Sequence, residues 1–147
     1  MKEPAIEFLD SRRIMAISTL RPDGWPQTTI VGYANDGWVI YFLIFRSSQK
    51  FANIQHDGRV SIAVGEEPQD LREAKAVYAG AQACEVTDPK QRKHAWRLLV
   101  ERHSNLADFL LPESSEAALM RDAGRFVSMV DYGKGLGHTD QRTVEAA

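Results

Sequence analysis

Two cations and two serines gather in the stretch RSSQK, residues 46–50. The apolar residues that follow them indicate a short helix over about residues 47–57. The amino end of a helix disfavours cations, because its aligned peptide dipoles give that end a partial positive charge. Arg46 and Lys50 are favourably placed if an anion binds there, since free helix N–H groups, serine hydroxyls and cations together form a phosphate site.

The same cluster also fits a purely structural arrangement. Ser47 or Ser48 would then cap the helix while both cations point into water, at a cost of only about 0.3–1 kcal/mol. On chemistry alone the two interpretations are even, and the cluster does not indicate which phosphate would bind.

The segment before this cluster reads as three strands. We expect them at about 13–20, 26–34 and 38–45, separated by the turn signals PDG at 22–24 and NDG at 35–37. The third strand, WVIYFLIF, is apolar at every position. It should therefore be covered on both faces, either inside a barrel or by a partner subunit.

The rest of the chain is expected to be mostly β with peripheral helices. Gly80 interrupts the longest of the later strands and predicts a bulge or bend in it. The expected elements are a helix at about 4–11, strands RVSIAV (59–64) and AKAVYAGAQACEV (74–86), a helix from Asp88 to about 103, a broken helical connection over 106–124, a strand RFVSMVDYG (125–133) and a glycine-containing tail. A small antiparallel barrel fits this order best.

Composition limits the function classes. The chain has 147 residues, 44% hydrophobic and 26% charged, with a net charge of −2, which gives no support to nonspecific nucleic-acid binding. We expect a single domain over 1–147 and no membrane span, because the longest apolar run has eight residues. A single cysteine, Cys84, excludes an intramolecular disulfide, and His56, His94 and His103 lack metal-ligand spacing. We expect a cytoplasmic protein without a metal.

Three features follow one another along the chain: the three-stranded meander, the basic and serine-containing helix start, and the segment NIQHDGRVSIAV. Their order resembles that of the pyridoxamine 5′-phosphate oxidase-like, FMN-binding split-barrel family. Members commonly read Arg-x-x-Ser-x-Lys-x-x-Asn-(Ile/Leu), then a polar turn and Arg-Val-Ser. Here the residues run RSSQKFANIQHDGRVS, with the first spacing one residue shorter, and YGKGLGHTD is similar to the tail of a bacterial subgroup. The resemblance, over about Phe8 to Asp140, implies a mainly β, six-stranded antiparallel split β-barrel that binds FMN at a homodimer interface.

The resemblance also implies a set of phosphate-binding residues. In this family basic and hydroxyl side chains hold the FMN phosphate. Lys50 matches the family's phosphate lysine, and Ser48 matches the hydroxyl two positions earlier. Arg46 would be a second cation beside Ser47, and Gln49 stands where the oxidases proper often carry arginine.

The second strand of the family runs beside the flavin ring. By an ungapped alignment, Thr28 and Thr29 would offer hydroxyls to the ring, while Ile30 and Val31 would offer backbone amides. The threonines are also explained by β-propensity alone. The oxidases proper carry basic residues at both ends of this segment, where this chain has Thr28 and Tyr33. That departure argues against pyridoxamine phosphate as the substrate.

We therefore expect an FMN-dependent oxidoreductase that acts on a small organic molecule. The flavin carries the hydride chemistry in such enzymes, which agrees with the absence of an evident acid–base set, and we name no catalytic residue. His138 could meet a substrate or the flavin edge, although packing of the tail explains it slightly better. The alternatives are a non-catalytic flavin- or haem-binding protein for storage, sensing or electron transfer, and a deazaflavin-dependent reductase. The sequence names neither the substrate nor the electron donor.

Overall fold

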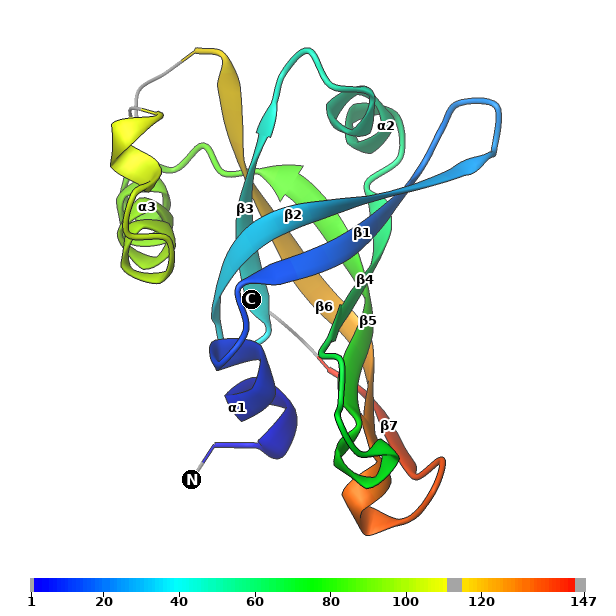
Figure 1. The fold of residues 1–147 in the computed structure, drawn as a ribbon. Coiled ribbons are helices and arrows are strands. Elements are labelled where there is room, and N and C mark those ends of the chain that lie inside the picture. The colour runs from blue at the N-terminus through cyan, green and yellow to red at the C-terminus, as the bar shows by residue number, and fades with distance from the viewer. Residues whose placement is uncertain (1, 111–114, 145–147) are drawn as a thin grey trace.

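The computed structural model describes residues 2–110 and 115–144. Its elements, coloured along the chain in Figure 1, are α1 (Pro4–Asp10), β1 (Ile14–Leu20), β2 (Pro26–Asp36), β3 (Val39–Phe45), α2 (Gln49–His56), β4 (Arg59–Gly65), η1 (Leu71–Glu73), β5 (Lys75–Glu85), α3 (Pro89–Arg102), η2 (Leu106–Asp108), β6 (Ala117–Asp131), η3 (Tyr132–Lys134) and β7 (Thr139–Thr143). The three predicted strands of the meander and both of its turns are confirmed.

The strands form one antiparallel sheet in the order β3-β2-β1-β4-β5-β6-β7. β6 also pairs with β3, from Val39 opposite Ala123 to Phe45 opposite Ala117, so six strands close into a barrel. β7 pairs only with the later part of β6, outside the closed ring. The predicted mainly β, six-stranded antiparallel barrel is confirmed.

Alternate residues of each strand fill the barrel interior, as the period of two in a strand requires. α1 closes one end of the barrel by placing Phe8 and Leu9 in the core, and the Tyr33 hydroxyl donates to the Leu9 carbonyl at 2.6 Å (Figure 1). The largest fully buried apolar side chains of this core are Tyr33, Phe42, Leu9, Met15, Ile17, Met120, Val64 and Val77.

α3 packs on the outside of the barrel, across β2 and β3 (Figure 1). Asp88 caps the helix by accepting from the Gln91 N–H at 3.0 Å, which confirms its predicted start. Ala95 and Leu99 of α3 form a second apolar cluster with Tyr41 of β3. The third strand is therefore covered on one face by the barrel core and on the other by a helix of its own chain.

The expectation of a broken helical connection over 106–124 is wrong from Ala117 onward, where β6 begins. The first half of β6 is buried on both faces, so its apolar residues lack the alternation that identifies a half-buried strand. Residues 111–114 of that expectation lie outside the described residues. Within the described residues, no helix is long and apolar enough to cross a membrane.

Candidate functional site

The amino end of α2 is capped by Ser48. Its Oγ accepts from the Phe51 N–H at 3.2 Å and donates to the Phe45 carbonyl at 2.6 Å. Ser48 thus satisfies one of the first backbone donors of the helix, while the N–H groups of Gln49 and Lys50 have no intrahelical acceptor. The structure selects Ser48 from the two predicted caps and leaves two backbone donors for an anion.

Arg46, the predicted second cation, is held by a carboxylate. Its Nη1 and Nη2 donate to Oε1 and Oε2 of Glu85 at 2.9 and 2.6 Å, and its guanidinium lies 5.6 Å from the centre of the Phe51 ring. The hydrogen bonds from Arg46 lower the pKa of Glu85, and those to Glu85 raise the pKa of Arg46. A phosphate would have to share this guanidinium with Glu85.

Two donor side chains at this helix start, those of Lys50 and Ser47, make no hydrogen bond or ion pair with the described residues. Lys50 is half-buried and Ser47 is exposed. Together with the two backbone N–H groups they form a donor set without a compensating carboxylate. This is the chemistry that a phosphate group requires.

A buried amide fixes the position of α2 on the barrel. Asn53 donates through Nδ2 to Thr19 Oγ1 at 2.9 Å and to Gln27 Oε1 at 3.1 Å, which attaches the helix to the β1–β2 hairpin. Gln49 donates through Nε2 to Asn53 Oδ1 at 2.8 Å. The sequence motif contains Asn53, but its positioning role was missed because its partners lie 26 and 34 residues earlier.

The four residues predicted to line the flavin ring divide between the two faces of β2. Thr28 and Ile30 face outward, and Thr28 Oγ1 lies 2.6 Å from Ser18 Oγ. Thr29 and Val31 face inward, and Thr29 Oγ1 is buried without a hydrogen-bond partner in the structure. An unpaired buried hydroxyl is costly alone, and because Thr29 faces the barrel interior, a water would be the partner that satisfies it.

His138 lies at the other end of the molecule from α2, between η3 and β7 (Figure 1). Its Nε2 is 3.2 Å from Asp140 Oδ2. Within one protomer it cannot meet a ligand held at α2. In the described part of the chain, no group of three or more His, Cys, Asp or Glu side chains could hold a metal ion.

The closed six-stranded barrel, with a short helix after its third strand that offers donors to an anion, defines a split-barrel protein. The family model described as pyridoxamine 5′-phosphate oxidase matches residues 1–130. The chain therefore belongs to the pyridoxamine 5′-phosphate oxidase family. None of the curated proteins matches it significantly.

Solved structures with this fold bind different ligands. A haem binding protein from Mycobacterium smegmatis superposes with a TM-score of 0.80 at 19% identity, over 97% of this chain and 59% of that chain. The haem storage protein HutZ from Vibrio cholerae gives 0.69 at 20% identity, over 79% and 84% of the two chains. An FAD-binding protein from Mesorhizobium loti gives 0.68 at 24% identity, over 85% and 90%. At these identities the likeness establishes the fold alone.

Proposed function

We propose that this protein is an FMN-dependent oxidoreductase that acts on a small organic molecule, with the flavin bound at a homodimer interface. The observation that carries the proposal is the start of α2, where Lys50 and two backbone N–H groups have no anionic partner among the residues that the structure describes. Family membership makes a flavin phosphate the first candidate for that anion.

The residues of the chain fit FMN at this site. The phosphate would be held by Lys50, the Ser47 hydroxyl and the first N–H groups of α2. Ser48 would stabilise the first turn of the helix as its N-cap. The strand segment from Thr28 to Val31 would run beside the ring, with Thr28 and Ile30 on its outward face. The bound flavin supplies hydride chemistry, so the protein's part is to bind, orient and exclude water.

An apolar row on the outer face of the sheet supports the homodimer. The row crosses four neighbouring strands, with one residue on each: Ile30 of β2, Ala16 of β1, Ala63 of β4 and Tyr78 of β5. Ile30 is 64% and Tyr78 48% exposed, and Ile14 adds a third exposed apolar side chain. A continuous exposed apolar row is typical of an interface, and a second copy of this chain would cover it.

The second candidate function is haem binding without turnover. It is favoured by the similarity to the haem binding protein of Mycobacterium smegmatis and the haem storage protein of Vibrio cholerae. Three of the four histidines are hydrogen-bonded within the chain, because His103 Nε2 bonds to the Tyr33 carbonyl at 2.9 Å, His94 Nε2 to Asp36 at 2.9 Å and His138 Nε2 to Asp140 at 3.2 Å. His56 is therefore the better candidate to ligate a haem iron.

The phosphate site is tested by Lys50→Met, with Lys90→Met as the matched control. Both lysines stand two residues after a side-chain N-cap, Ser48 in α2 and Asp88 in α3. We expect Lys50→Met to weaken FMN at least tenfold in a fluorescence titration and to leave riboflavin, which lacks the phosphate, within twofold. Lys90→Met should change neither affinity.

Equal losses of FMN and riboflavin in Lys50→Met would place the phosphate elsewhere. Unchanged FMN affinity would refute the role of α2 altogether.

A further inference from the structure

A pocket of about 220 Å³ lies at the end of the molecule opposite α2, between α1, β6 and β7 (Figure 1). Its floor is apolar, because Val127 of β6 belongs to the barrel core and Met129 packs against that core. Ala5 of α1 and Trp38 of the β2–β3 turn form its sides. Pockets for drug-sized ligands have about 300–1,000 Å³, so this pocket suits a smaller molecule.

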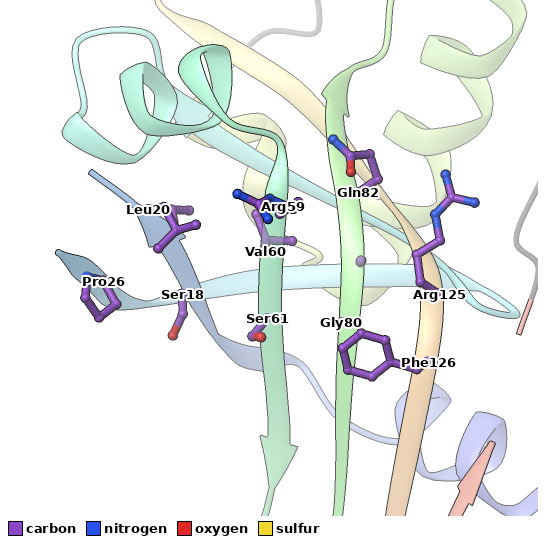
Figure 2. Close-up of a pocket in the computed structure, with 12 residues that line it drawn as sticks. Ser18, Leu20, Pro26, Arg59, Val60, Ser61, Gly80, Gln82, Arg125 and Phe126 are labelled. Atoms are coloured by element: carbon purple, nitrogen blue, oxygen red, sulfur yellow. The ribbon is translucent and has the colours of Figure 1, made fainter. Parts of the chain in front are cut away.

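This pocket lies on the other face of β6 from the proposed dimer interface. β6 has a bulge where Phe126 pairs with Gly80, which confirms the bulge or bend predicted there, and beyond it Phe126 faces outward while Val127 faces inward. The larger hollow on the outer face, over Ser18, Ser61 and Phe126 (Figure 2), continues the apolar row. A second copy of the chain would cover that hollow and leave the pocket beside α1 open.

The rim of the pocket carries both signs of charge. Among the described residues that line it, Glu3 and Asp140 are acidic, and Lys134 and Arg142 are basic. Arg142 pairs with Glu3, and its guanidinium lies 5.6 Å from the centre of the Trp38 ring, so this ion pair joins β7 to the start of α1. The four formal charges cancel, which favours a ligand that carries both signs over a simple anion or cation.

Lys134 and Asp140 lie close together and keep free hydrogen-bonding groups. Lys134 Nζ is 3.8 Å from Asp140 Oδ2, which is beyond hydrogen-bond distance. The same oxygen lies 3.2 Å from His138 Nε2, whereas Asp140 Oδ1 accepts no hydrogen bond from residues 2–110 or 115–144. The pair therefore presents ammonium donors and a carboxylate acceptor side by side at the rim.

We propose that this pocket binds an α-amino acid with an apolar side chain, of about the size of leucine. An α-amino acid carries its ammonium and its carboxylate on one carbon, so the carboxylate can face Lys134 while the ammonium faces Asp140 Oδ1. The side chain would lie on Val127 and Met129. Charge-assisted hydrogen bonds and the burial of apolar surface would both stabilise the complex.

The proposal does not depend on the proposed flavin function. The pocket and the start of α2 share no residue, and they lie at opposite ends of the protomer (Figure 1). The amino acid would be a ligand of a second site and not a substrate of the flavin.

The probe is L-leucine, titrated into the full-length protein by calorimetry. We expect saturable binding that Lys134→Met and Asp140→Asn each weaken about tenfold, because each change removes one charge-assisted contact. The matched controls are Lys93→Met, at an exposed position of α3, and Asp108→Asn, at an exposed position of η2, and both should bind leucine within twofold of the wild type. Unchanged affinity in Lys134→Met or in Asp140→Asn would overturn the proposal, and so would the absence of leucine binding by the wild type.

Three related ligands separate the contributions of charge and shape. 4-Methylpentanoate is leucine without its ammonium, so it should bind more weakly than leucine, and Asp140→Asn should not weaken it further. Glycine keeps both charges but has no apolar side chain, and 6-aminohexanoate, an isomer of leucine, carries its charges at opposite ends of the molecule. Both should bind more weakly than leucine. Equal affinity for leucine and any of these three ligands would overturn the assignment.

The leucine titration is repeated on protein saturated with FMN. The affinity should stay within twofold, because the two sites are formed by different residues. Displacement of FMN by leucine would overturn the assignment of a separate site. Leucine binding by a protein that fails to bind FMN would refute the flavin function alone and would support the amino-acid site.

Discussion

Replacing Asp122 with asparagine tests whether a buried carboxylate makes this barrel sensitive to pH. Asp122 lies on β6 opposite Ile40 and Ala83, and its side chain is 0% exposed. Neither carboxylate oxygen has a hydrogen-bond partner within the structure. With no compensating charge, burial raises the pKa of Asp122 to about 8.

The sign of the effect follows from this raised pKa. An unfolded aspartate has a pKa near 3.9, so between about pH 4 and about pH 8 the folded protein keeps a proton that the unfolded chain releases. The contribution of Asp122 to stability is complete below about pH 4 and declines as the pH rises to about 8. The slope in that window is about 1.4 kcal/mol per pH unit.

Asparagine has nearly the same shape and no charge, so Asp122→Asn removes this slope. The stability of Asp122→Asn relative to the wild type should increase by about 3 kcal/mol between pH 5 and pH 7. Urea unfolding at each pH, followed by tryptophan fluorescence, measures the free energy of unfolding of both proteins. Subtracting the two free energies of unfolding at each pH removes the contribution of every titrating group that the two proteins share. Asp108→Asn, at an exposed position, controls for the effect of an aspartate-to-asparagine substitution itself.

A stability difference that stays constant from pH 5 to pH 7 would refute the reasoning. It would mean that the folded state holds Asp122 in the same protonation state as the unfolded chain, and that the carboxylate is solvated or paired.

Three other substitutions test separate parts of the structure. Ile30→Glu places a charge in the exposed apolar row and should convert the proposed homodimer to a monomer in light scattering; a dimer of unchanged stability would place the interface elsewhere. Gly80→Ala should lower the free energy of unfolding by about 1–3 kcal/mol, because the new Cβ meets the Phe126 ring, and adding Phe126→Ala should recover most of that loss. Arg102→Ala should cost about 2–3 kcal/mol in urea unfolding, since the guanidinium donates to Asn35 Oδ1 at 2.7 Å; a cost below 0.5 kcal/mol would show that this bond contributes little.

The parts of the fold that the sequence predicts well are those with a local signal. The turns PDG and NDG place Gly24 and Gly37 at positive φ, 86° and 59°, which few other residues adopt easily. The continuously apolar third strand is buried on both faces as expected, but α3 of the same chain, and not a partner subunit, covers its outer face. Asp88 is also a local signal: as an N-cap followed by a proline, it correctly predicted the start of α3.

The elements that were missed lack such a signal. β7, TDQRT, is polar and exposed at every position, so only its backbone pairing with β6 makes it a strand. In the candidate site, the amino end of α2 was predicted at Ser47 or Ser48, but the ion pair between Arg46 and Glu85 was not foreseen. That ion pair requires β3 and β5 to flank the same strand, β6, which no local pattern indicates.

Flavin binding is the central claim, and the absorption spectrum of the purified full-length protein, before and after addition of FMN, tests it most directly. We expect flavin bands and saturation at one FMN per protomer, two per homodimer. A Soret band in place of the flavin bands would support the haem-binding function. A colourless protein that FMN does not reconstitute would contradict the account.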